Sequence, residues 1–203
     1  MDNRATFDFP RPLHIEGLGL QLREWTADDV ADLVALYDDP EIDRWTPVPS
    51  PFDAEAARAY LAAAEQQAAE GRTVQLAITT DGGPPQGEIL LFRSATDERD
   101  LELAYGVGPA YRGRGLATRA VRLVVRFARR RVGGRRVVLC IEEGNGASEA
   151  VAKAAGFALT DDEPIVRTAK GREVVLRTWS HLDGEDVLSE GQSDGVLGEG
   201  RRR

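Results

Sequence analysis

The chain has 203 residues, a net charge of −8 at pH 7 and 42% hydrophobic residues, which suits one domain with a sizeable core but not two full domains. It has no apolar run near the ~18 residues of a membrane span and no signal-peptide core, so we expect a cytoplasmic protein without a membrane partner. The negative charge disfavours a general nucleic-acid binder, and a single cysteine, Cys140, excludes an intrachain disulfide.

Apolar periodicity and capping residues predict a mixed order of strands and helices in the first half of the chain. Thr26 and Asp53 are typical helix N-caps, and three prolines favour an extended loop between the two helices. The expected elements are a flexible lead over residues 1–19, a strand at 20–24, a helix from 26 to about 39, a loop at 45–51, a helix from 53 to about 70, and strands at 74–80, 88–93 and 101–107.

The second half continues with a glycine-rich loop and a long amphipathic helix. Leu116, Ala120 and Leu123 begin an apolar stripe at helical spacing. We expect one domain over residues 20–182 and a disordered acidic tail over 183–203, because the tail has six acids and few large apolar side chains. The other expected elements are a strand at 136–141, a helix from 145 to about 156, and a hairpin of strands at 158–168 and 173–179.

The loop before the long helix reads Arg112-Gly-Arg-Gly-Leu-Ala-Thr118. Glycine lets a ligand approach the backbone, and the first N–H groups of a helix lack partners within it, so the loop predicts a diphosphate site. It lacks the Gly-Lys-Ser/Thr of a Walker loop and the G-x-G-x-x-G of a dinucleotide fingerprint, and an ordinary strand-to-helix turn is the alternative. The residues expected to hold the diphosphate are Arg112, Gly113, Arg114, Gly115, Leu116, Ala117 and Thr118.

This loop resembles the acetyl-CoA-binding motif of the GNAT N-acetyltransferases, Arg/Gln-x-x-Gly-x-Gly/Ala, which Arg112, Gly115 and Ala117 match. The run from Asn145 to Phe157 resembles the later helix of the family, where Asn-x-x-Ser leads to Gly-Phe. Together the two blocks look most like the Rim-type ribosomal-protein N-acetyltransferases. The resemblance covers about residues 20–180 and implies an α+β GNAT fold (α/β three-layer), with a mixed, mostly antiparallel sheet of six to seven strands and flanking helices.

The resemblance implies transfer of the acetyl group from acetyl-CoA to a primary amine by direct attack. In the family two strands separate beside the motif, so the backbone of Tyr105, Gly106 and Val107 would bind the cofactor and polarise its carbonyl. Asn145 would contact CoA, although Asn is also a preferred N-cap. No metal site is expected, since the two histidines are far apart in sequence and lack ligand spacing.

Two residues are candidates for proton transfer. The resemblance implies that Glu102 is the general base, and the alternative is a solvent-facing strand carboxylate. Ser148 would stabilise the leaving thiolate, and the alternative is a polar residue in the first turn of a helix. Many members carry a tyrosine as general acid where this chain has Ala152, which leaves room for a non-catalytic acyl-CoA sensor on the same fold.

The acceptor is expected to be an amine of low pKa. Neutralising a lysine amine at pH 7 costs ~4.6 kcal/mol, whereas a peptide α-amine costs only ~1 to 1.4 kcal/mol, which favours a peptide N-terminus or a small-molecule amine. The loop over residues 41–52, with Trp45, would shape the acceptor pocket, although Trp45 could equally belong to the core. Ten arginines between residues 112 and 136 are either a solvated helix face or a field for the phosphates of CoA or RNA, and a homodimer is left open.

Overall fold

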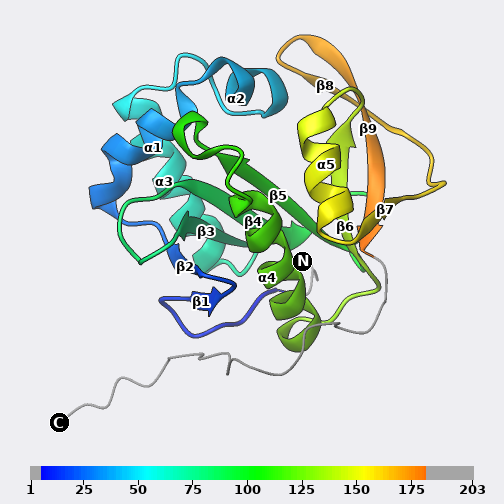
Figure 1. Cartoon of the computed structure of the whole chain (residues 1–203), viewed down its shortest axis with the longest axis horizontal. Helices are drawn as coiled ribbons and strands as arrows, with labels where there is room; N and C mark the ends of the chain where they lie inside the picture. Colours follow the sequence, from blue (N-terminus) through cyan, green and yellow to red (C-terminus); the bar gives the residue numbers. More distant parts are fainter. Residues whose placement is uncertain (1–5, 182–203) are drawn as a thin grey trace.

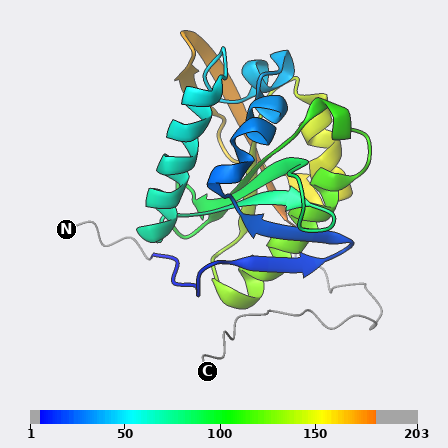
Figure 2. The ribbon, with the colours of Figure 1, turned by 90° about the vertical axis from the view of Figure 1, so that its left-hand side faces the viewer.

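The structure is a computed structural model that describes residues 6–181, so the predicted acidic tail lies outside the described residues. A central sheet separates two helical layers (Figures 1 and 2). Its strands are β1 (His14–Gly17), β2 (Leu20–Glu24), β3 (Thr73–Thr79), β4 (Gly87–Arg93), β5 (Leu101–Val107), β6 (Val137–Glu142), β7 (Phe157–Leu159), β8 (Ile165–Ala169) and β9 (Arg172–His181). Its helices are α1 (Val30–Tyr37), α2 (Pro40–Trp45), α3 (Ala54–Ala69), α4 (Leu116–Arg131) and α5 (Gly146–Ala154), with 3₁₀ turns at Ala27–Asp29 and Pro109–Tyr111.

The sheet order is β1-β2-β3-β4-β5-β6-β9-β7, with β8 paired to β9. All neighbours are antiparallel except β5 and β6, which are parallel and pair only at Leu101 with Val137 and at Glu102 with Val138. Beyond these pairs, residues 103–107 and 139–142 of the two strands are not joined by any described ladder. We call this opening the β5–β6 fork.

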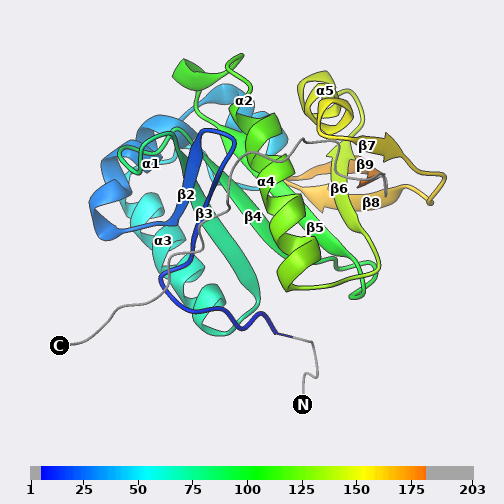
Figure 3. The same cartoon turned by 60° about the horizontal axis from the view of Figure 1, so that its bottom comes forward.

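Helix α4 confirms the predicted apolar stripe. It lies across β4 and β5, while α5 lies beside β6 and β7 (Figure 3). Leu116, Ala120 and Leu123 are buried in the main core, whereas part of the arginine face binds the chain itself. Arg119 donates to the carbonyl of Leu18 at 2.9 Å. Helices α1 to α3 lie on the other side of the sheet (Figure 2), with a second core of their own.

The structure differs from the sequence prediction at both ends of the sheet, which has nine strands within residues 6–181 rather than six to seven. The lead expected over residues 1–19 contains β1, which pairs with β2 and buries Ile15. The strand expected at 158–168 is two strands, because proline and three acids interrupt it between β7 and β8. Both pair with the long β9.

The expected loop at 41–52 begins instead as helix α2. Asp39 caps this helix, since its Oδ1 accepts hydrogen bonds from the amides of Glu41 and Ile42, each at 3.1 Å. Pro40 occupies the first helical turn, where its missing N–H costs nothing. None of the described helices is long and apolar enough to cross a membrane.

Candidate active site

The glycine-rich loop leaves open space beside its backbone. Gly113 and Gly115 have φ of +74° and +69°, a region that favours glycine. A Cβ atom built on either glycine would meet no atom within 4 Å. Gly115 is the N-cap of α4, so the space lies at the start of a long helix, where the backbone dipoles favour an anion.

The amides of this loop are available for a ligand. Within the described part of the chain, the amides of Gly113, Arg114 and Gly115 donate no hydrogen bond to another backbone group outside the helices and strands. The first bond of α4 runs from the amide of Arg119 to the carbonyl of Gly115 at 3.1 Å. The amides of residues 116–118 therefore have no acceptor within the helix. Such a row of free donors fits a diphosphate.

The side chain of Arg112 is directed away from this row of amides. Its Nη2 lies 2.5 Å from Oδ1 of Asp39, and its Nε donates to the carbonyl of Val107 at 3.1 Å. Partial burial raises the pKa of Asp39, but the bonds from Arg112 and the α2 amides outweigh it and hold that pKa below its usual value. Arg112 thus fixes the loop against α2, and the free donors of the loop are mainly backbone amides.

The backbone of β5 offers further donors at the fork. The amide of Leu101 donates to the carbonyl of Arg136 at 2.9 Å, toward β6. Since strand amides alternate in direction, those of Tyr105 and Val107 also point toward this edge, where β6 no longer pairs. Ala104 is exposed although it lies in the middle of the sheet. The fork is therefore open and lined by unpaired amides.

Tyr105 and Ser148 meet across the fork. The Tyr105 hydroxyl lies 2.8 Å from Ser148 Oγ and 3.2 Å from the Ser148 carbonyl oxygen. Burial raises the pKa of Tyr105. Asn145 caps α5, because its Oδ1 accepts from the amide of Ser148 at 3.0 Å. Ala152 is fully buried and carries no group that could donate a proton.

Glu102 lies at the closed end of the fork, where β5 and β6 still pair. Its side chain is buried, and one carboxylate oxygen accepts from Ser94 Oγ at 2.9 Å. The thiol of Cys140 lies near the Glu102 carboxylate. Its pKa is raised to about 12, mainly by burial and secondly by the negative charge of Glu102. Cys140 is half-buried. Glu102 is thus not a solvent-facing carboxylate.

A second buried carboxylate, Glu88 on β4, was missed by sequence reasoning. Its side chain is 0% exposed and accepts from the hydroxyls of Tyr37 and Tyr60 and from Gln75 Nε2, the last two at 2.6 and 2.8 Å. Burial raises the pKa of Glu88, although these hydrogen bonds oppose the shift. The only local signal was an acid directly before the apolar run Ile89-Leu-Leu-Phe92.

Helix α2 and the β8–β9 hairpin meet at the rim of the fork. Lys170 Nζ lies 2.6 Å from Asp43 Oδ1, and Arg172 binds both carboxylate oxygens of Glu142, at 2.5 and 2.9 Å. Trp45 is half-buried on α2 and donates from Nε1 to Glu41 at 2.9 Å. It therefore lies at the surface of α2 rather than in either core.

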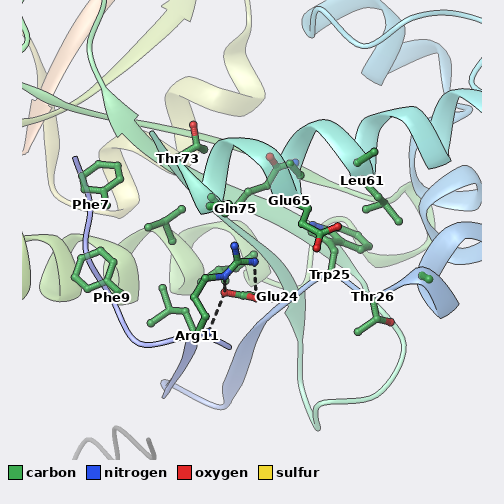
Figure 4. Close-up of a pocket in the computed structure, with 18 of the residues that line it drawn as sticks. Phe7, Phe9, Arg11, Glu24, Trp25, Thr26, Leu61, Glu65, Thr73 and Gln75 are labelled. Atoms are coloured by element: carbon green, nitrogen blue, oxygen red, sulfur yellow. Dashed lines mark hydrogen bonds and ion pairs between the residues drawn. The ribbon is translucent and has the colours of Figure 1, made fainter. Parts of the chain in front are cut away.

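A cavity of about 630 Å³ lies elsewhere, between the N-terminal segment, the end of β2 and α3 (Figure 4). Trp25 and Gln75 belong to its wall. The described residues contain no group of three or more His, Cys, Asp or Glu side chains that could hold a metal ion.

Comparison with known proteins agrees with this geometry. Residues 19–158 match the family described as Acetyltransferase (GNAT) domain, whereas a search among curated proteins gives no match. The ribosomal L7/L12 alpha-N-protein acetyltransferase RimL in complex with coenzyme A has a TM-score of 0.71 at 16% identity, over 83% of this chain and 97% of that chain. RimJ from Mycobacterium smegmatis in complex with CoA-disulfide has a TM-score of 0.67 at 19% identity, over 82% of this chain and 85% of that chain.

The microcin C7 self immunity acetyltransferase MccE in complex with acetyl-CoA and AMP has a TM-score of 0.71 at 14% identity, over 82% of this chain and 93% of that chain. These similarities show a shared fold, and they include Rim-type proteins, as the sequence motifs indicated. The match over residues 19–158 covers well over half of the sequence. The chain therefore belongs to the GNAT acetyltransferase family.

Proposed function

We propose that the protein transfers the acetyl group of acetyl-CoA to a primary amine by direct attack. The observation that carries this proposal is the row of unused amides from Gly113 to Thr118 beside the open β5–β6 fork. Acetyl-CoA fits this arrangement because its diphosphate needs backbone donors and its thioester needs a passage between strands. It supplies an acetyl group already activated as a thioester. Solved structures with CoA or acetyl-CoA on the same fold support this choice of co-substrate.

The roles of the chain's own residues follow from their positions. Residues 112–118 bind the diphosphate, chiefly through their amides. The backbone of Tyr105, Gly106 and Val107 orients the co-substrate, and the amides of Tyr105 and Val107 polarise the reacting carbonyl. Ser148, hydrogen-bonded to Tyr105, stabilises the leaving thiolate, while Asn145 holds the start of α5.

The proton of the acceptor amine goes to one of the two buried carboxylates, Glu102 or Glu88. Glu102 is the one implied by the resemblance to the family. The acceptor is a peptide or protein N-terminus, or a small amine of similar pKa, since an α-amine costs only ~1 to 1.4 kcal/mol to neutralise at pH 7. The ribosomal-protein acetyltransferases among the structural neighbours support a protein acceptor. A cytoplasmic location is part of the same proposal.

Calorimetry with acetyl-CoA, followed by thiol release across a panel of peptide and small-molecule amines, tests this function. We expect binding at micromolar concentrations and release of thiol with at least one α-amine. An absence of measurable acetyl-CoA binding would contradict the proposal. Binding without thiol release from any amine would favour the alternative, a non-catalytic acyl-CoA sensor. This alternative rests on Ala152, which is buried at the position where many family members carry the general acid.

A further inference from the structure

The buried carboxylate of Glu88 lies at the centre of a network on the α1–α3 face of the sheet. Three elements send hydrogen-bond donors to it: Tyr37 ends α1, Tyr60 belongs to α3, and Gln75 belongs to β3. The indole N–H of Trp25 is also near this carboxylate but is not aligned for a hydrogen bond. Burying a carboxylate is costly, and these hydrogen bonds offset only part of that cost, because the pKa of Glu88 is still raised.

One of these donors reaches the fork. A Cβ atom on Gly106 would lie 3.6 Å from Cε1 and 3.8 Å from the hydroxyl oxygen of Tyr37. Gly106 belongs to the open part of β5 and pairs with Glu88 across the β4–β5 ladder. The hydroxyl of Tyr37 therefore lies within ordinary contact range of β5 at Gly106, in the open part of the strand. Tyr37 thus lies between the fork and Glu88.

The opposite side of the network leads toward the cavity of about 630 Å³. Trp25 and Gln75 belong both to the surroundings of Glu88 and to the wall of that cavity (Figure 4). Its wall is partly polar, and Arg11 and Glu24 form an ion pair there at 2.9 Å. Glu88 itself does not line the cavity, and Gln75 and Trp25 are the side chains that contact both.

We propose that Tyr37 and Glu88 form the relay that removes the proton of the acceptor amine. This inference rests on the proposed function and assigns one of its steps. The acceptor ammonium gives a proton to Tyr37 Oη while the Tyr37 hydroxyl proton passes to Glu88 Oε2. The products are a neutral amine, an unchanged tyrosine and a protonated Glu88. The amine nitrogen then bonds to the acetyl carbon as the carbon–sulfur bond breaks. The sulfur leaves as a thiolate that accepts a hydrogen bond from Ser148, and it takes the remaining surplus proton of the nitrogen, so the products are the amide, the free thiol of CoA and an unchanged serine.

The position of Glu102 argues against it as the direct acceptor. Its carboxylate lies where β5 and β6 are still paired and is bonded to Ser94. The Cys140 thiol lies beside it. Glu88 instead is hydrogen-bonded to the hydroxyl of Tyr37, which lies near Gly106 in the open part of β5. Among the described residues, the ionisable groups hydrogen-bonded to Glu88 are Tyr37 and Tyr60, with Gln75 as a neutral donor.

The pKa directions are consistent with this role. Burial raises the pKa of Glu88, which brings a carboxylate closer to the operating pH of a proton acceptor. Burial and the charge of Glu88 raise the pKa of Tyr37 well above its ordinary value. Tyr37 therefore passes a proton on and does not remain ionised.

The test compares Glu88→Gln, Tyr37→Phe and Tyr60→Phe with the wild-type protein. Turnover is measured from pH 5.5 to 9.5 with the best amine from the thiol-release panel, and acetyl-CoA affinity is measured by calorimetry. Glu88→Gln and Tyr37→Phe should each lower kcat by ~100-fold, with acetyl-CoA affinity unchanged. Glu88→Gln should also abolish the acidic limb of the pH profile of kcat.

Tyr60→Phe is the matched control, since it removes a donor to the same carboxylate from α3 rather than from α1. It should lower kcat at high pH far less than Tyr37→Phe does, and its acidic limb should move to higher pH, because the hydrogen bond from Tyr60 lowers the pKa of Glu88 and its loss therefore raises that pKa. Equal losses of kcat in Tyr37→Phe and Tyr60→Phe would mean a structural role and overturn the relay. If Glu88→Gln does not fold, these two tyrosine variants decide the question.

Two other outcomes separate this inference from the proposed function. A wild-type kcat in Glu88→Gln, with a large loss in Glu102→Gln, would assign the proton to Glu102 and leave the acetyltransferase intact. A wild-type protein that does not bind acetyl-CoA would instead refute the proposed function itself.

Discussion

Nη2 of Arg112 lies 2.5 Å from Oδ1 of Asp39, and this pair joins the glycine-rich loop to helix α2. The same Oδ1 caps α2 through the amides of Glu41 and Ile42. Arg112 also binds the carbonyl of Val107 at the end of β5. One carboxylate oxygen therefore fixes the loop proposed to bind the diphosphate, and also the helix at the rim of the fork.

Substitution of Asp39 should separate its two roles. Asp39→Ala removes the helix cap and the ion pair, so we expect a loss of ~1 to 2 kcal/mol of unfolding free energy. Asp39→Asn keeps a capping oxygen and should lose less than half of that. Both variants should weaken acetyl-CoA binding severalfold, because the loop is no longer held by Arg112. Urea denaturation and calorimetry measure the two effects, and equal destabilisation by both variants would show that the cap contributes little.

Gly115→Ala tests the loop without filling the core. A left-handed conformation costs a non-glycine residue roughly 1 to 2 kcal/mol, but nothing lies within 4 Å of the added Cβ, so the protein should fold. Acetyl-CoA affinity should fall at least tenfold, because the methyl group enters the space beside the loop amides.

Gly133→Ala is the control for that variant. Gly133 also has a φ of +69° and open space around it, but it lies after the end of α4. It should cost similar stability while leaving acetyl-CoA affinity unchanged. If both variants lose the same affinity, the diphosphate site is not at residues 112–118.

Ser148 and Tyr105 should act as a unit in turnover. Ser148→Ala and Tyr105→Phe each break the 2.8 Å contact between their hydroxyls, so each should lower kcat by ~10- to 100-fold and leave acetyl-CoA affinity nearly unchanged. Because they share one interaction, the double variant should lose little more than the worse single variant. Steady-state kinetics of the three proteins measures this, and strictly multiplicative losses would show that the two hydroxyls act independently.

Stability should depend on pH through Glu88. An unfolded glutamate titrates near ~4.3, whereas burial raises the pKa of Glu88 in the folded protein. Between these two values the folded state binds more protons than the unfolded state, so the unfolding free energy falls as pH rises. Glu88→Gln lacks this term, and the other carboxylates contribute equally to both proteins.

Urea denaturation of the wild type and of Glu88→Gln at several pH values above 4.5 therefore compares the two directly. The wild type should lose stability relative to Glu88→Gln as pH rises, by ~1.4 kcal/mol for each pH unit until the folded pKa is reached. A difference that is constant with pH would mean that Glu88 titrates normally.

Local pattern was sufficient for much of the fold. The apolar stripe of α4 and the short apolar runs of β3 and β4 are patterns that each segment carries by itself. The glycine-rich loop was also predicted from neighbouring residues, because two glycines before an apolar-periodic helix constrain the backbone locally. The prolines after Trp45 misled the prediction for α2, although the local signal, Asp39 followed by Pro40, was the one that decided the structure.

The number of strands depended on tertiary pairing. β1 is short, and it forms a strand because it pairs with the edge of β2 and buries Ile15 in the core. The short β7 and β8 are both strands because the long β9 pairs with each of them. A short segment cannot carry such information, since the stabilising hydrogen bonds come from another part of the chain.

The sequence by itself determined the family motifs and the order of the main elements, because those depend on residues close together in the chain. Only the tertiary structure showed that Glu88 is buried with Tyr37 and Tyr60, which lie 51 and 28 residues away, and that Arg112 binds Asp39. The pKa and the partner of a side chain depend on what the fold brings within a few ångströms. That proximity is a property of packing, and no periodicity in the sequence encodes it.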